Sequence, residues 1–267
     1  MRRAIICCLL ILSAGPPAFA APPSVFLEEL TWTELRDAVA GGATTAIVPI
    51  GGTEQNGPLM ALGKHNARAK ALAGMIASAL GDAIVAPVMA YVPEGAIEPP
   101  QAHMKFPGTL TITDAVFENV LESTAQSLRH AGFKTVVFLG DHGSYQKDLA
   151  AVADRLTARW AKSDVRVSYI PEYYRVTQGD YVQALKDHGA APGDIGTHAG
   201  LADTSLMLAI DPSLVRQDKL ATATDLNDAH GIYGGTPKRA TAELGRLGVD
   251  LIVKQTVAAI KRAANRT

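Results

Sequence analysis

The sequence contains few cysteines, few aromatic residues and almost no excess charge, and each shortage excludes a class of protein. Its 267 residues include two cysteines, 6% aromatic residues, and 25 basic against 26 acidic side chains. Two cysteines cannot build a disulfide framework or a four-cysteine zinc site. The balanced charge argues against a nucleic-acid partner, and 48% hydrophobic residues argue against a disordered chain. Any metal must therefore bind through His, Asp, Glu or Asn.

No apolar run approaches the roughly 20 residues that a membrane span needs. The most apolar stretch, residues 4–12, follows two arginines and precedes an Ala-Phe-Ala sequence at residues 18–20. This order is typical of a secretory signal and its cleavage site. We predict a signal peptide at residues 1–20, a mature domain at 21–267 without cysteine or membrane span, and a periplasmic or secreted location. An N-terminal segment retained as an anchor is the alternative.

Short β-rich runs alternate with longer helical patterns along the mature chain. Strands are expected at 44–50, 83–88, 134–139 and 165–170. Helices are expected at 31–40, 65–80, 113–130, 145–160 and 237–264, the last with an interruption near Gly245 or Gly248. Trp32 and Trp160 lie in helical patterns and are expected in the core. The alternation predicts a single three-layer α/β/α domain with a mostly parallel central sheet.

Polar, glycine-containing loops follow two of the predicted strands. The first loop contains Glu54 and leads to His65, and the second contains Asp141 and His142. Open parallel sheets bind ligands beyond the carboxyl ends of their strands. If the two strands are neighbours, these side chains should converge on one crevice, where carboxylate and imidazole groups suit Zn²⁺ or Mn²⁺.

Phosphate binding is an alternative role for the first loop. Gly52 and Gly57 have Walker-like spacing, but Pro58 and Leu59 stand where Lys and Ser or Thr are needed. We therefore do not expect a nucleotide site.

Two further segments carry candidate functional residues. His198 and Asp203 lie close together, where Asp203 could cap a helix over 204–210 or line a site beside His198. The long connection between Pro87 and Thr109 holds Glu94 and His103, which could contact a substrate or lie on the surface.

The motifs and their order resemble the creatininase (creatinine amidohydrolase) family of metal-dependent amidohydrolases. The resemblance covers residues 30–34, 49–58, 106–109, 140–143, 198–205 and 236–245. It implies a creatininase-like fold, amide hydrolysis with divalent ions, and a homo-oligomer, often a hexamer.

The resemblance also implies a set of metal ligands. The family's first motif supplies a Glu, a His two residues later and an Asp nine residues further on that lies between two ions. Here Glu54 is retained, whereas Asn56 and His65 occupy the other two places. His142 matches a later His ligand, and Ser144 replaces a Glu. Because an imidazole nitrogen offers only one lone pair, we expect one Zn²⁺ or Mn²⁺ ion held by Glu54, His65 and His142.

Two imidazoles and one carboxylate match the ligand count of catalytic zinc sites, which activate water and polarise carbonyls. The resulting hypothesis is a metal-dependent hydrolase of a small cyclic or linear amide. Creatinine itself is not expected, because the loop aromatics that shape its pocket in the family have no evident counterpart. His198 and Asp203 are the candidate catalytic residues, orienting groups at the ion or moving a proton to the leaving nitrogen.

The substituted motif positions equally support a metal-free, non-catalytic binding protein with the same fold. A serine hydrolase is a third reading, because Asp141, His142, Ser144 and Ser205 supply the residue types. Adjacent residues cannot form a triad among themselves, and no Gly-x-Ser-x-Gly elbow occurs. Metal content would separate the first two classes.

Overall fold

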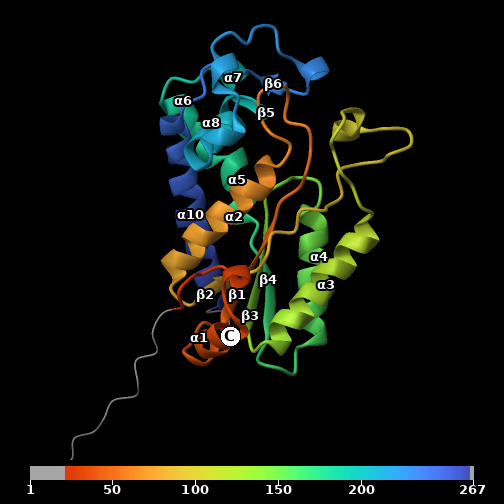
Figure 1. Cartoon of the computed structure of the whole chain (residues 1–267), viewed down its shortest axis with the longest axis vertical. Coiled ribbons are helices and arrows are strands. Elements are labelled where there is room, and N and C mark those ends of the chain that lie inside the picture. The colour runs from red at the N-terminus through yellow and green to blue at the C-terminus, as the bar shows by residue number, and fades with distance from the viewer. Residues whose placement is uncertain (1–21, 265–267) are drawn as a thin grey trace, which may run out of the picture.

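A computed structural model describes residues 22–264, in which one parallel sheet lies between two layers of helices (Figure 1). Four strands pair in the order β2-β1-β3-β4. They are β1 (Thr45–Ile50), β2 (Ala83–Val85), β3 (Thr135–Gly140) and β4 (Arg166–Tyr169). Every pairing between these strands is parallel. The predicted three-layer α/β/α fold is therefore confirmed.

Helices cover both faces of the sheet. One face packs against α1 (Trp32–Ala40), α3 (Asp114–His130) and α4 (Gln146–Arg159). The other face packs against α2 (Lys64–Leu80), α5 (Glu172–Gln178), α8 (Leu201–Ile210) and α10 (Ala242–Ala264). Successive side chains of a strand point to opposite faces. Ile47 accordingly belongs to the α2 side and Val48 to the α3 side, and both are fully buried.

Local sequence signals explain several helix ends. Thr31 and Glu34 form a capping box that starts α1, and Gly81 ends α2 in the left-handed conformation. The expectation that Trp32 lies in the core is wrong. As the first residue of α1 it is 74% exposed, whereas Trp160 is buried as predicted. A capping box fixes where a helix begins, but not which side of its first turn faces the sheet.

The last helix is continuous rather than interrupted at its glycines. α10 runs through Gly245 and Gly248, where an added Cβ would collide with Ser205 of α8 and with Tyr181. These glycines therefore allow α10 to pack closely against its neighbours.

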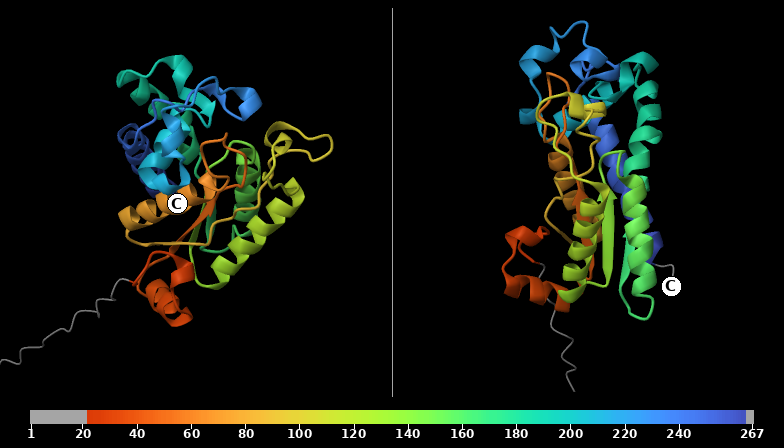
Figure 2. Two further views of the ribbon diagram at one scale, coloured as in Figure 1. Left: turned by 45° about the horizontal axis from the view of Figure 1, so that its top comes forward. Right: turned by 90° about the vertical axis from the view of Figure 1, so that its right-hand side faces the viewer.

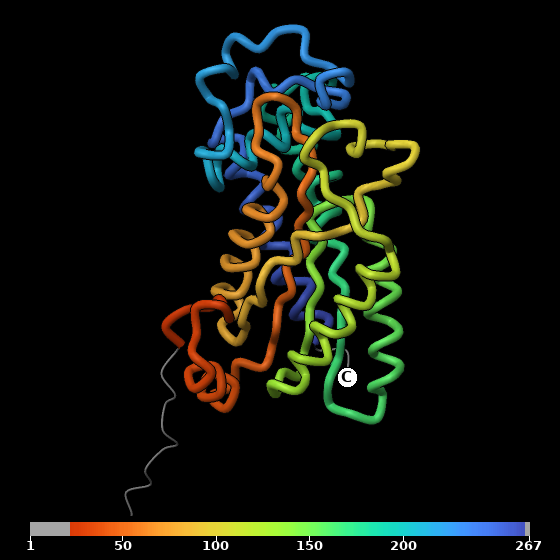
Figure 3. Tube along the Cα trace, turned by 45° about the vertical axis from the view of Figure 1, so that its right-hand side comes forward, coloured from red at the N-terminus to blue at the C-terminus, as the bar shows by residue number. Residues whose placement is uncertain are grey.

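A smaller layer sits beyond the carboxyl ends of the strands, at the end of the molecule opposite α1 (Figure 2). It contains α6 (Asp180–Asp187), α7 (Pro192–Ile195), α9 (Gln217–Leu220) and an antiparallel pair of β5 (Gly196–His198) and β6 (Tyr233–Gly235). The loop that follows β1 reaches the same end (Figure 3).

Within residues 22–264, none of the helices is both long and apolar enough to cross a bilayer. The predicted signal peptide at residues 1–20 lies outside the described residues.

Candidate active site

The two polar loops meet because β1 and β3 are neighbours. β2 lies on the other side of β1, so the helices that follow β1 and β3 cover opposite faces of the sheet. A crevice forms where strand order reverses in this way. Glu54 lies in the loop after β1, His65 in the first turn of α2, and Asp141 and His142 directly after β3. The expected convergence of these four side chains is present.

Glu54 forms the centre of the site. Its side chain is fully buried, and its Oε1 lies 2.7 Å from His65 Nε2. On the far side of the ring, His65 Nδ1 donates to Asp141 Oδ2 at 2.6 Å. Nε2 therefore faces the Glu54 carboxylate, and at that distance a proton or a cation lies between the two.

His142 approaches the other oxygen of the same carboxylate. Its Nε2 lies 3.3 Å from Glu54 Oε2, which has no hydrogen-bonding partner among residues 22–264. Ser144 Oγ donates to the Pro93 carbonyl, so it accepts from His142 Nδ1 at 2.9 Å. The Ser144 amide also lies 3.3 Å from Nδ1, so Ser144 holds the ring with Nε2 facing Glu54.

The donor set fits a divalent metal ion. Ligand atoms of Glu54, His65 and His142 all lie within 4.8 Å of one another. Burial raises the pKa of Glu54, but His65 and His142 lower it further, so the net pKa lies well below the usual value. Burial lowers the pKa of His142, yet its contact with Glu54 raises it above the usual value. The space among the three side chains therefore favours a positive charge.

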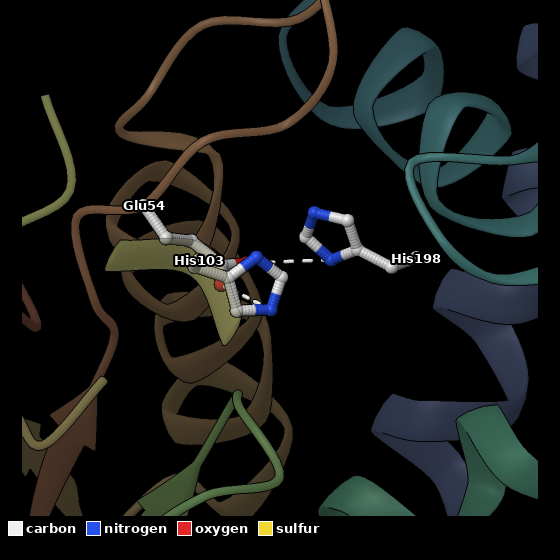
Figure 4. A group of neighbouring side chains, drawn as sticks. All are labelled: Glu54, His103 and His198. Atoms are coloured by element: carbon white, nitrogen blue, oxygen red, sulfur yellow. Dashed lines mark ion pairs between the residues drawn. The ribbon is translucent and has the colours of Figure 1, made fainter. Parts of the chain in front are cut away.

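Glu54 also belongs to a second group, which the sequence did not predict. In Figure 4 the rings of His103 and His198 are directed toward its carboxylate. His103, on a 3-10 helix at Ala102–Lys105, places Nε2 3.2 Å from Glu54 Oε2. His198, in β5, places Nδ1 3.6 Å from Oε1.

The hydrogen bonds of this second group differ from those of the first. Gln55 Nε2 donates to His103 Nδ1 at 2.9 Å, which assigns the proton of His103 to Nε2, facing Glu54. His198 Nε2 donates to the Gln55 backbone carbonyl at 2.9 Å, which turns the Nδ1 lone pair toward Lys64 Nζ at 3.5 Å. Burial lowers the pKa of His103 to about 4 and that of His198 to about 3, so both rings are neutral at pH 7.

Two buried cations border the site, and the sequence analysis missed both. Lys64 Nζ lies 2.7 Å from Asp203 Oδ2, and Arg68 contacts both Asp203 and Asp141. Burial raises the pKa of Asp203, but Lys64 and Arg68 lower it well below its usual value. Lys64, His65 and Arg68 stand on one side of an otherwise alanine-rich helix, because residues three and four apart share a helix face. That polar stripe was the available signal.

Asp203 does not cap a helix as one reading of the sequence proposed. α8 begins at Leu201, and Asp203 lies in its first turn, where it accepts from the Ala199 amide at 3.0 Å. The side chain is held by the two cations and stays ionised.

Two of the residues at substituted motif places, Asn56 and Ser144, donate to backbone carbonyls. Asn56 donates to the carbonyls of Glu54 and Ala61, both at 2.9 Å. Glu94 is buried next to His142 Nδ1 at 3.5 Å, and burial raises its pKa to about 8. Glu94 and His103 thus lie at the site rather than on the surface.

A cavity of about 470 Å³ opens beside these groups. Its walls include Lys64, His103, Tyr174, Lys186, His198 and Tyr233. This volume lies in the range of pockets that bind small molecules.

The fold and site define a single α/β domain with a buried carboxylate–imidazole centre at the switch point of a parallel sheet. The chain belongs to the creatininase family, since residues 28–260 match the family described as "Creatininase: Creatinine amidohydrolase". The predicted family is therefore confirmed.

Two characterised relatives have different substrates in their names. A creatinine amidohydrolase of Pseudomonas putida is 29% identical over 202 residues, which are 74% of this chain and 76% of that enzyme. The mycofactocin precursor peptide peptidase of Mycolicibacterium smegmatis is 31% identical over 211 residues, which are 76% of this chain and 73% of that protein. The chain thus stands among creatininase-family hydrolases that act on diverse substrates.

Solved structures agree with this placement. A crystal structure of creatininase aligns with a TM-score of 0.75 at 25% identity, covering 92% of this chain and 100% of that chain. Two further creatininase structures, one described as a Zn-Zn type and one as Mn, have TM-scores of 0.74 at 25% identity. Each covers 91% of this chain and 99% of its own chain.

Proposed function

We propose that this protein is a metal-dependent amidohydrolase that cleaves the C–N bond of a small cyclic or linear amide other than creatinine. The observation that supports this most is the convergence of one buried carboxylate and two imidazole Nε2 atoms, from Glu54, His65 and His142, beside a cavity of about 470 Å³. The names of the two relatives, an amidohydrolase and a peptidase, both denote amide cleavage.

The three side chains would hold one Zn²⁺ or Mn²⁺ ion. Such an ion supplies Lewis acidity toward a carbonyl and makes water a better nucleophile at neutral pH. Asp141 and Ser144 fix the orientation of the two rings through their distal nitrogens.

His198 would serve as the proton carrier. Its ring is neutral and lines the cavity, and its Nδ1 faces Lys64 Nζ at 3.5 Å and Glu54 Oε1 at 3.6 Å. A neutral imidazole there can accept a proton and return it to the leaving nitrogen. Asp203 is ionised and paired with two cations, so its role is to hold Lys64 and Arg68 rather than to donate a proton.

The alternative is a metal-free binding protein with the same fold. It is favoured by one observation, namely that the Lys64 ammonium already contacts the site and partly neutralises it. We propose a periplasmic or secreted location and a homo-oligomer for either function, from the signal-like N-terminus and the family resemblance.

Metal analysis and a substrate screen test the proposal. We expect about one Zn²⁺ or Mn²⁺ per chain and hydrolysis of at least one lactam, hydantoin or linear amide, lost on chelation and restored by the ion. Glu54→Gln should lose both the ion and the activity, whereas His188→Ala, at an exposed position, should lose neither. Protein that retains no ion after equilibration with Zn²⁺ and Mn²⁺ would favour the binding protein.

A further inference from the structure

Lys64 has an environment that is unusual for a lysine. Its side chain is 1% exposed, although lysine is almost never fully buried without a partner. Nζ lies 2.7 Å from Asp203 Oδ2, 3.5 Å from His198 Nδ1 and 3.6 Å from Glu54 Oε1. The ammonium is therefore surrounded by two carboxylates and one imidazole nitrogen, the same kinds of donor that bind divalent metal ions.

The orientation of His198 shows that this arrangement is specific. Because its Nε2 donates to the Gln55 carbonyl, the Nδ1 lone pair remains for Lys64. Nδ1 is also the atom that His198 places nearest Glu54 in the second group of candidate metal ligands. Lys64 thus competes for the donors that a second ion would need.

The net charge of the buried site also argues against a second divalent ion. The ionised carboxylates and the cations that face them are Glu54, Asp141, Asp203, Lys64 and Arg68. Their net charge is one negative, so one divalent ion would leave one positive charge, whereas two ions would leave three. Ionisation of Glu94 would offset only one of these positive charges. Uncompensated buried charge is costly, so a second ion is strongly disfavoured while Lys64 is present.

We propose that Lys64 takes the place of a second divalent ion in this site. Its ammonium fills the position among Asp203, His198 and Glu54, restricts the site to the single ion at Glu54, His65 and His142, and holds His198 at the cavity wall. Lys64 is in this sense a positioning residue. The count of one ion in the wild type rests on the proposed function, whereas the role of Lys64 rests on its own contacts.

Metal stoichiometry of Lys64 variants tests the proposal. Lys64→Met and Lys64→Gln remove the charge, Lys64→Arg keeps it, and Lys70→Met is the matched control on the exposed side of the same helix. Each protein is equilibrated with Zn²⁺, freed of unbound metal and analysed for zinc per chain. We expect one ion in the wild type, Lys64→Arg and Lys70→Met, and two in Lys64→Met and Lys64→Gln. Adding His198→Ala to Lys64→Met should return the count to one.

The two hypotheses fail in different ways. The wild-type count tests the proposed function, while the difference between wild type and the neutral variants tests Lys64. No ion in the wild type and one in Lys64→Met would refute the hydrolase yet support Lys64 as the resident cation. Equal counts in wild type and both neutral variants would overturn the proposal. Failure of both neutral variants to fold in millimolar Zn²⁺ would also overturn it, because a second ion should then replace the lost charge.

Discussion

The two sides of the Glu54 carboxylate carry the same residue types but differ in chemistry. On one side, His65 and His142 turn Nε2 toward Glu54, while their Nδ1 atoms contact Asp141 and Ser144. On the other side, His103 presents a proton, and His198 presents its lone pair to a buried ammonium. The first side carries the ligand set proposed for a metal ion, and the second contains the Lys64 ammonium. Partners on the distal nitrogens, rather than the histidines themselves, make the difference.

The largest expected effect separates the two sides directly. His142→Ala removes a proposed ligand, so the Zn²⁺ affinity of the variant should fall by more than the roughly 10–100-fold that loss of a ligand's hydrogen-bond partner costs. His103→Ala should retain the ion, because its proton-bearing nitrogen faces Glu54. Competition with a chelator measures both affinities. Equal losses in the two variants would erase the distinction between the sides.

The next effect concerns the stability of the side that contains Lys64. Asp203→Asn leaves two buried cations short of a partner, which should lower the free energy of unfolding by about 3–5 kcal/mol. Denaturant unfolding of the metal-free protein measures the change, with Asp154→Asn on the exposed face of α4 as the control. A loss below about 0.5 kcal/mol, typical of surface substitutions, would show that Asp203 is not needed to balance the cations.

A smaller effect is expected behind His65, a proposed ligand. Asp141→Asn weakens the hydrogen bond that fixes the ring, so Zn²⁺ affinity should fall by about 10–100-fold. Tyr173→Phe removes only one donor to Asp141, at 2.8 Å, and should have a lesser effect in the same direction. Calorimetric titration compares the two. If Tyr173→Phe weakened binding more than Asp141→Asn, the assigned ring orientation would be wrong.

The smallest effect belongs to an ion-pair network on the surface. Hydrogen bonds from Arg155, followed by those from Arg159, lower the pKa of Glu122 below its usual value. Because the pKa of Glu122 is lower in the folded protein, its ionised form stabilises the fold at pH values above the unfolded pKa of about 4.3. This stabilisation is lost as the pH falls through the folded-state pKa. Glu122→Gln should cost less than about 1 kcal/mol at pH 7, and less in high salt or at pH 3. Unfolding at both pH values measures it, and a cost that grows toward pH 3 would contradict the sign.

Much of the fold followed from local sequence signals. The strands at Thr45–Ile50 and Thr135–Gly140 and the helix at Asp114–His130 lie within a residue of their predicted bounds. β2 is shorter than predicted and ends at Val85. Continuous apolar runs and helix caps extend over a few residues, so they are readable without tertiary information. The face of a helix that packs against the sheet cannot be read in this way, as the exposed Trp32 shows.

The candidate site was predictable in part. Motif order pointed to Glu54, His65 and His142, and the structure brings them together, although their role as ligands stays a prediction. Lys64 was signalled only by the polar stripe of its helix, because its partner Asp203 is more than a hundred residues away in sequence. Gln55 was overlooked because its neighbour His198 is equally distant, and contacts of that kind leave no trace in spacing.

The sequence by itself determined the alternation of strands and helices, the family, and the residue types available at the strand ends, since all of these depend on short-range patterns and ordered motifs. Only the tertiary structure decided which histidine nitrogens face Glu54 and which cation lies beside it. Those properties depend on partners supplied by distant segments in a buried, poorly solvated space, where a single hydrogen bond or charge changes what the site can bind.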